Sequence, residues 1–319
     1  MSSQIDRRRL MRGAMALGGM AGLAGCATGS AMSAPGVAIA TSARPTIPLA
    51  PIRATADRLF DVTVCLRPFR AAGPRIEAEQ IGDTRVVHNY GHGGSGWSLS
   101  WGSGEVAVRL AMESSPAEVA VIGCGALGLT AATLAQRAGA EVTIYARDPP
   151  PNTRSARATG AFTPDSRIAL TSKVAPGFPA LWEQMARTSF KSFRNYLGLP
   201  GAPVEFNDRY YLSDAPSDAA PSESPASAPP GYLDFASYGA AIHDIVPRPT
   251  LLPPGATPFA SRYVRRSTGL MFNIADYAHT LMSDFLIAGG RFERREFQAP
   301  SQIAAPCRKT SGSPEPPSR

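Results

Sequence analysis

Three glycines spaced as a dinucleotide-binding loop are the first residues in the chain with a defined chemistry. Gly123, Gly125 and Gly128 form the pattern G-x-G-x-x-G. The first glycine allows a tight turn, the second lets a pyrophosphate approach the backbone, and the third lets a helix pack closely against a strand. Ala126 and Leu127 would open that helix, whose N-terminus offers free N–H groups and a positive dipole end.

The segments on both sides of this loop support dinucleotide binding. Residues 118–122 are a near-continuous apolar run, residues 127–138 have the pattern of a helix, and residues 141–145 form a second apolar run. This order predicts a β-α-β unit of a parallel sheet. Arg147 or Asp148, which follow the second strand, would face the adenosine ribose. Because FAD and NAD(P) both use such a loop, the loop alone leaves both cofactors open.

A second glycine-rich segment spans residues 88–102, between a strand predicted over 85–90 and a helix predicted over 104–112. Its glycines permit close approach of a flat or charged ligand, and it ends at a helix N-terminus. His88 and His92 are four residues apart, but in a loop this spacing gives them no shared face. We therefore expect no metal site.

At these residues the chain resembles a known family. Residues 65–77 and 88–94 closely resemble the signature of the D-amino-acid oxidase family, which includes D-aspartate oxidase. Residues 119–145, 158–164 and 274–297 are similar to the same family's FAD domain and part of its substrate domain. In the family the arginine and histidine-glycine segment normally lies at the C-terminus, so this chain resembles a circularly permuted member. That order requires the helix over 104–112 and the strand at Val119 to be neighbours.

The resemblance implies an FAD-dependent enzyme that oxidises a D-amino acid to an imino acid, which hydrolyses to a 2-oxo acid and ammonia, while dioxygen becomes hydrogen peroxide. It implies that Arg67 pairs with the substrate carboxylate, for which a planar guanidinium is well suited. Gly94 is the second residue predicted to take part in catalysis. Backbone N–H groups of the loop would stabilise negative charge on the reduced flavin. The other matches are Gly93, Gly96, Trp97 and Ser98 beside the flavin, Gly160 and Ala161 beside the isoalloxazine, and Phe297 on the adenine side.

Hydrophobic periodicity predicts the remaining elements: strands over 60–66, near Glu205, and over 210–212, 267–272 and 290–297, and helices over 178–197 and 274–288. The predicted fold class is α/β, a Rossmann-like FAD-binding domain with a parallel sheet plus an incomplete α+β substrate domain. The FAD-binding domain would span 56–165. The partial substrate domain and returning FAD-domain elements would span 166–297, with a mobile insertion at 214–230.

The ends of the chain predict export rather than folding. Residues 1–25 combine Arg7 to Arg9 with a small apolar run, as in a twin-arginine signal, and the run is too short to span a bilayer. Cys26 follows Leu23, Ala24 and Gly25 as in a bacterial lipobox, which leaves a lipid anchor and an ordinary signal both open. We expect a flexible linker over 26–55, a periplasmic or membrane-anchored protein facing the periplasm, and a disordered tail over 298–319 from a truncated or frameshifted reading frame.

Composition narrows the function classes. The chain has 319 residues, 44% of them hydrophobic, which is enough for a core. Its net charge of +7 falls to +4 without residues 1–25, and no basic run with interleaved aromatic residues follows, so we expect no nucleic-acid partner. Three functions stay open at this point: an exported FAD-dependent D-amino-acid oxidase, a non-catalytic remnant with weak or no flavin binding, and an NAD(P)-dependent dehydrogenase.

Overall fold

The computed structural model describes residues 53–59, 61–215, 231, 233–298 and 302. All of them belong to one compact unit, Pro45–Arg319. The predicted export signal, most of the linker, residues 216–230 of the predicted insertion, and nearly all of the predicted tail lie outside the described residues. Among the described helices, none combines the length and the apolar character needed to cross a membrane.

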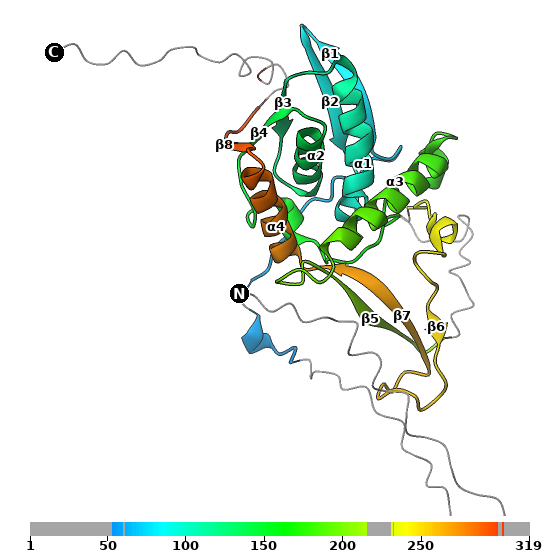
Figure 1. Ribbon diagram of the computed structural model, residues 1–319. Coiled ribbons are helices and arrows are strands. Elements are labelled where there is room, and N and C mark those ends of the chain that lie inside the picture. Colours follow the sequence, from blue (N-terminus) through cyan, green and yellow to red (C-terminus); the bar gives the residue numbers. More distant parts are fainter. Residues whose placement is uncertain (1–52, 60, 216–230, 232, 299–301, 303–319) are drawn as a thin grey trace, which may run out of the picture. The chain divides into compact units, whose positions relative to one another are not determined.

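Helices and strands alternate along most of the described chain (Figure 1). In order they are β1 (Arg75–Ile81), β2 (Thr84–Tyr90), α1 (Gly96–Ala111), β3 (Glu118–Ile122), α2 (Ala126–Arg137), β4 (Glu141–Ala146), α3 (Phe178–Phe193), β5 (Val204–Ser213), β6 (Thr250–Leu251), β7 (Tyr263–Phe272), α4 (Ile274–Ile287) and β8 (Arg291–Arg294). Short 3-10 turns lie at Ala56–Arg58, Met112–Ser114, Arg154–Arg157, Thr171–Lys173, Arg194–Tyr196 and Gly239–Ile242.

The parallel sheet has the strand order β3-β4-β8. β3 pairs with β4 in the register Val121 to Ile144, and β4 pairs with β8 in the register Ile144 to Phe292. β4 is buried along most of its length, as expected for a strand with a neighbour on each side. The predicted β-α-β unit over 118–145 is confirmed, and the fold is mixed α/β with a Rossmann-like sheet. β8 is shorter than the strand predicted over 290–297.

Helix α1 begins at Gly96, eight residues before the predicted start at Gly104. Glycine and serine lower the helix propensity of its first half, which is why the sequence pattern misses it. Burial compensates, because Leu99 and Trp101 are almost fully enclosed. The hydroxyl of Thr130 on α2 donates to the carbonyl of Ser100 at 3.0 Å, which joins the two helices. α1 thus packs on helix α2 of the Rossmann unit, whereas the prediction named the strand at Val119 as its neighbour.

A second sheet has the order β5-β7-β6, with all neighbours antiparallel. The two strands predicted near Glu205 and over 210–212 are one continuous strand, β5, and β7 starts four residues earlier than predicted. The segment that follows the η turn at Arg154–Arg157 runs beside the end of β7, where Ala161 forms a bridge with Met271. Gly160 and Ala161, which are predicted to lie beside the isoalloxazine, are therefore held next to the end of β7.

The strand predicted over 60–66 is wrong for the described residues 61–66. They have no regular secondary structure and are exposed; Val64, for example, is 90% exposed. Their alternation of apolar and polar side chains is typical of a strand, but the described residues supply no strand beside them. A strand needs a partner for its backbone N–H and C=O groups, and periodicity does not reveal whether one exists.

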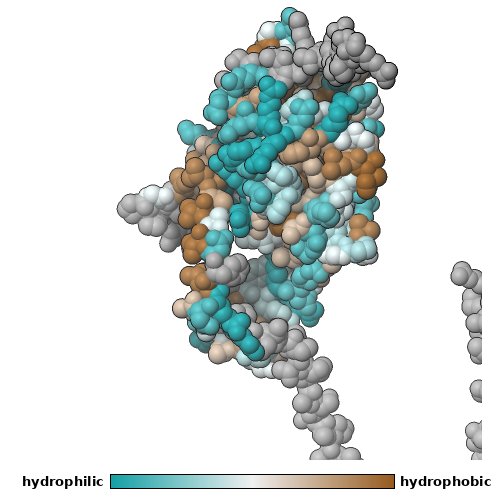
Figure 2. Space-filling view, turned by 90° about the vertical axis from the view of Figure 1, so that its left-hand side faces the viewer, coloured by the Kyte–Doolittle hydropathy of each residue, from teal (hydrophilic) through white to brown (hydrophobic). Residues whose placement is uncertain are grey.

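An aromatic cluster joins elements that are far apart in the sequence. The indole N–H of Trp101 on α1 donates to the hydroxyl of Tyr277 on α4 at 2.7 Å. Tyr277 stacks on Phe272 of β7 with ring centroids 5.8 Å apart, and Phe193 of α3 lies 4.6 Å from Phe272. The surface on the side of α4 shows apolar residues in separate patches among hydrophilic ones (Figure 2). The aromatic cluster thus joins α1 to α3, α4 and β7.

Candidate functional site

The glycine loop has the backbone geometry that its sequence predicts. Gly123 has φ +104°, a conformation that favours glycine. A Cβ on Gly128 would overlap the carbonyl oxygen of Gly123, so only glycine allows α2 to pack this closely on the end of β3. Ala126, the first residue of α2, and Leu127 follow Gly125 directly. The N-terminus of α2 therefore points into the loop, where it can hold an anion.

Ser155 is a component of this loop that sequence reasoning missed. The backbone N–H of Ala126 donates to the Ser155 hydroxyl at 3.0 Å, and a Cβ on Gly125 would lie 2.7 Å from the same oxygen. The carbonyl of Ser155 accepts the indole N–H of Trp97 at 2.9 Å. Ser155 thus ties the start of α2 to the start of α1. Only its position a few residues after the second strand of the β-α-β unit could have drawn attention to it.

A cavity of about 320 Å³ opens beside the loop. It unites cofactor residues that were predicted from three separate parts of the sequence: the glycine loop, the end of β4 and the segment after β8. Its walls also contain Tyr145, Thr153, Arg154 and Ser155, which were not predicted. The predicted members are Gly123, Gly125, Arg147, Asp148 and Phe297.

Charged and aromatic side chains surround the mouth of this cavity. Arg147 Nε donates to Asp148 Oδ2 at 2.7 Å, and this hydrogen bond is the main reason why the pKa of Arg147 is raised. The guanidinium of Arg295 lies 5.2 Å from the ring centroid of Phe297. Burial raises the pKa of the Cys124 thiol to about 12, so this loop residue is neutral. The mouth offers cations and an aromatic face to a ligand with phosphates and a planar base.

Arg67 lies against the second glycine-rich segment. Phe69 forms an antiparallel bridge with His92, and the N–H of Gly93 donates to the carbonyl of Pro68 at 3.0 Å. A Cβ on Gly94 would overlap Nη1 of Arg67. The exposed Arg67 guanidinium therefore sits beside Gly94, just before α1 begins. The predicted pair of Arg67 and Gly94 is brought together.

The backbone amides expected to face the flavin divide into two groups. The N–H of Gly93 is used by Pro68, and the N–H of Gly94 donates to the carbonyl of Ser166 at 2.8 Å. These two amides are therefore not free for a flavin, contrary to the expectation for the whole loop. The N–H groups of Gly96, Trp97 and Ser98 belong to the first turn of α1, which has no earlier helical carbonyl to bond. In this segment, the N–H groups left to face a negative charge are therefore those of the first turn of α1.

Gly160 and Ala161 lie next to the start of α1. Gly160 has φ +75°, and a Cβ there would overlap the carbonyl of Phe272. The hydroxyl of Ser98 donates to the carbonyl of Ala161 at 3.4 Å and accepts the N–H of Thr163 at 2.8 Å. Trp97 is buried among the aromatic rings of the core, and its ring centroid lies 5.3 Å from that of Tyr277. Ser98 and Trp97 thus orient the segment that carries Gly160 and Ala161.

His92 is a buried polar side chain with no hydrogen-bond partner among the described residues, at either ring nitrogen. It is 1% exposed, and burial lowers its pKa to about 3, so the imidazole is neutral. The Asn89 amide likewise has both polar atoms buried without a partner in the described chain. Buried polar groups normally have partners, so this end of the site is incomplete as the protein alone. In the described part of the chain, no His, Cys, Asp and Glu side chains gather as a metal site.

The three parts of the predicted site are linked by contacts rather than by a shared cavity. Arg67 touches Gly94, α1 starts two residues later, and Trp97 reaches the glycine loop through Ser155. The cavity beside the loop does not include Arg67 or the residues 93–98. Its size, its glycine backbone and the N-terminus of α2 fit the adenosine diphosphate half of a dinucleotide.

Over short segments the chain is similar to D-amino-acid and D-aspartate oxidases. The chain is similar to a D-amino-acid oxidase from Rubrobacter xylanophilus, 51% identical over 55 residues, which is 17% of each chain. It is 48% identical over 54 residues to a D-aspartate oxidase from Cryptococcus neoformans, covering 16% of this chain and 14% of the relative. A D-aspartate oxidase from Talaromyces thermophilus is 48% identical over 73 residues, 20% of each.

These matches span at most 20% of the length of those relatives. A longer match covers residues 118–311, which fit the model of the family described as FAD dependent oxidoreductase. That region begins at β3 and contains the glycine loop, both strands of the β-α-β unit and all three strands of the sheet β5-β7-β6. The chain belongs to the FAD dependent oxidoreductase family.

Proposed function

We propose that this protein binds FAD and oxidises D-amino acids to 2-oxo acids and ammonia, with dioxygen as the electron acceptor. The observation that carries the proposal is the position of the Arg67 guanidinium beside Gly94, at the end of a segment that leads into α1. A cation there can pair with a carboxylate, and the first turn of α1 adds N–H groups for a second negative charge. Identity to D-amino-acid and D-aspartate oxidases over short segments supports this substrate class.

The chain's own residues would hold and orient the reactants. Gly123 to Gly128 and the N-terminus of α2 would hold the diphosphate, and Asp148 would accept from the ribose. Arg67 would fix the substrate carboxylate and so align the α-hydrogen. Bound FAD would accept that hydrogen with its electron pair and pass the electrons to dioxygen, giving hydrogen peroxide. No side chain of the site needs to act as a base towards the α-carbon, because the α-hydrogen would leave with its electron pair; the proton lost from the substrate ammonium would pass to water.

The neutral His92 suits this chemistry. Because its pKa lies well below neutral pH, it can donate one hydrogen bond and accept another while staying uncharged. In the described part of the chain it has no partner at present, so a polar edge of the cofactor or substrate would satisfy it. We assign His92 to orientation rather than to proton transfer.

One spectroscopic experiment distinguishes this proposal from the two alternatives, a non-catalytic remnant and an NAD(P)-dependent dehydrogenase. The full chain is purified, its flavin absorbance is recorded, and D-alanine or L-alanine is added without oxygen. Bound flavin that bleaches with D-alanine and not with L-alanine is the expected result. Flavin that binds without bleaching would point to a non-catalytic remnant. Binding of NAD(P) in place of FAD would contradict the cofactor assignment.

We also propose that the protein is exported, with Cys26 as the site of a lipid anchor. The support is the sequence of residues 1–26, which lies outside the described residues. Expression of the chain and of its Cys26→Ser variant, followed by separation of membrane and periplasmic fractions, tests this. We expect the parent chain in membranes and the variant in the soluble periplasmic fraction.

A further inference from the structure

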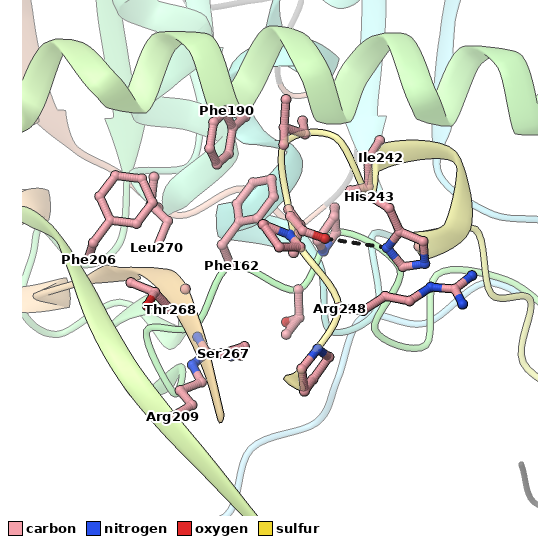
Figure 3. Close-up of a pocket in the computed structure, with 18 of the residues that line it drawn as sticks. Phe162, Phe190, Phe206, Arg209, Ile242, His243, Arg248, Ser267, Thr268 and Leu270 are labelled. Carbon is pink, nitrogen blue, oxygen red and sulfur yellow. Dashed lines mark hydrogen bonds between the residues drawn. The ribbon is translucent and has the colours of Figure 1, made fainter. Parts of the chain in front are cut away.

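A second cavity, of about 210 Å³, lies on the second sheet, away from the glycine loop (Figure 3). It is bounded by β7, by residues 162–165 and by the segment that precedes β6. Phe162, Phe190, Phe206 and Leu270 gather on one side of it (Figure 3). None of the residues assigned to the FAD or to the substrate carboxylate lines this cavity.

The cavity coincides with a gap along one edge of β7. Towards the start of β7, Arg265 and Arg266 pair with β6. Towards its end, Phe162 N–H donates to the Leu270 carbonyl at 3.0 Å and Phe272 N–H donates to the Gly160 carbonyl at 2.6 Å. Between these two pairings, residues 267–269 face no strand on that edge in the described chain.

Strand geometry places one free donor and one free acceptor in the gap. In an antiparallel strand, the backbone groups of alternate residues point to the same edge. Val264, Leu270 and Phe272 bond towards this edge, so Thr268 also presents its N–H and C=O there. No described backbone group bonds to either of them. The Thr268 hydroxyl is engaged elsewhere, since it donates to Asp208 at 2.7 Å.

We propose that this gap binds one free α-amino acid that has an apolar side chain and the L configuration. A residue placed opposite Thr268 in an antiparallel pair would exchange two hydrogen bonds with it. In a free amino acid, the α-ammonium group donates to the Thr268 carbonyl, and the carboxylate accepts the Thr268 N–H. The gap spans three residues of β7, 267–269, between β6 and the Ala161 segment, and only Thr268 among them turns its backbone groups to this edge, so the gap offers the hydrogen bonds of one residue.

The side-chain preference follows from the faces of the sheet. Directly opposed residues of an antiparallel pair place L side chains on the same face. Phe206 and Leu270 are paired and lie on the same face of the sheet as Thr268. The ring centroid of Phe190 lies 6.4 Å from that of Phe206. Phe206 is 46% exposed, so an apolar ligand would cover it. A D-amino acid would turn its side chain to the opposite face, which carries Ser267 and Arg209.

The proposal goes beyond the oxidase reaction, because the proposed substrate has the D configuration and binds at Arg67. The test therefore measures binding and not turnover. L-leucine is titrated into the full chain without oxygen, and its saturation-transfer NMR signal is recorded. D-leucine and 4-methylpentanoate, which lacks the amino group, are then tested as competitors of that signal. We expect both to compete at least tenfold more weakly than L-leucine.

Two variants locate the site. Thr268→Pro removes the N–H that faces the gap without removing a hydrogen bond between strands, and should weaken L-leucine binding at least tenfold. Thr268→Val keeps the backbone donor and should bind as the parent chain does. Equal binding by Thr268→Pro, checked for folding by circular dichroism, overturns the proposal. If Thr268→Pro does not fold, the ligand series decides, since equal competition by 4-methylpentanoate or D-leucine, or no L-leucine binding, also overturns it.

Discussion

Arg67 and Arg70 stand three residues apart and have different surroundings. Arg70 Nε donates to the carbonyl of Gly73 at 3.2 Å, and its guanidinium lies 5.6 Å from the ring centroid of Tyr90. Arg67 instead is exposed and extends beside Gly94, which its Nη1 approaches closely. The same residue type thus serves packing at one position and, in our proposal, binding at the other.

Replacing Arg67 by Lys should weaken D-amino-acid binding roughly tenfold to a hundredfold, because an ammonium group keeps the charge but loses the paired hydrogen bonds. The concentration of D-alanine that half-bleaches the bound flavin measures this. Arg70→Lys is the matched control and should leave that concentration within about twofold of the parent value. Equal effects of both changes would remove Arg67 from the substrate site.

His92 should make stability depend on pH. Its pKa is lowered to about 3 by burial, whereas the unfolded chain has the ordinary value of 6.5. Below pH 6.5 the unfolded state binds a proton that the folded state does not, so stability falls as the pH decreases towards 3, by up to about 1.4 kcal/mol per pH unit. Above pH 6.5 this residue adds no pH dependence.

Urea unfolding of the parent chain at pH 7 and pH 5 measures this dependence. The same comparison in His92→Gln should show a smaller loss between the two pH values, since glutamine does not titrate. The exposed His279→Gln variant is the control and should lose stability as the parent does. An unchanged pH dependence in His92→Gln would mean that the imidazole is protonated in the folded protein.

At the residue scale, the sequence predicts groups that lie next to one another along the chain better than groups that meet in space. Gly123, Gly125 and Gly128 are adjacent, and their spacing alone indicates their roles. Ser155 is distant from the loop in sequence, and no pattern marks it. Likewise the sequence places His92 in a loop but does not reveal that both of its nitrogens are buried without a described partner.

Helix α2 depends on the close approach of its first turn to β3. Gly128→Ala should cost about 1–3 kcal/mol of stability, because its Cβ would overlap the Gly123 carbonyl. Gly96→Ala is the matched control at the start of α1, where a Cβ meets no atom within 4 Å. We expect the free energy of unfolding of that control to equal the parent's or to exceed it by up to about 1 kcal/mol. Equal destabilisation by both would show that packing at the loop is loose.

Ser155 should act as an external cap of α2. Ser155→Ala removes the acceptor for the Ala126 N–H and should lower stability by about 1 kcal/mol and weaken FAD binding. Ser155→Thr keeps a hydroxyl and should recover most of both losses. Urea unfolding and flavin-fluorescence titration measure the two effects. Parent-like FAD affinity in Ser155→Ala would mean that α2 holds the diphosphate without this link.

Elements were predicted best where local pattern and tertiary environment agree. β3, α2 and β4 each lie within about one residue of their predicted bounds. β4, which is buried along most of its length, has the nearly continuous apolar run expected of a central parallel strand. The prediction missed the first half of α1, because its glycines and serines have low helix propensity and the helix there is stabilised by burial. The strand predicted at residues 61–66 is wrong because the local pattern is that of a strand but no described strand lies beside it.

At the scale of the whole molecule, the order of the elements differs from their arrangement in space. α1 precedes β3 in the sequence, and residues 112–117 join them, with Ser115 in a left-handed conformation at φ +48°. Yet α1 packs on α2 and α3, as the hydrogen bonds from Thr130 to Ser100 and from the Gly102 N–H to Ser189 show. Residues 112–117, called the joint below, therefore connect α1 to β3, but the packing of α1 in the core comes from α2 and α3.

Cutting the chain in this joint should leave the fold intact. Residues 1–114 and 115–319, expressed together as two chains with a tag on one, are expected to purify as a stoichiometric complex, because Leu99 and Trp101 of the first piece are buried by the second. A Trp101→Asp change in the first piece should abolish the complex, whereas Arg109→Ala, which lies in the last turn of α1, should not. Recovery of the first piece alone as a folded, soluble monomer would contradict this account, since its apolar helix face would then be stable in water without α2 and α3.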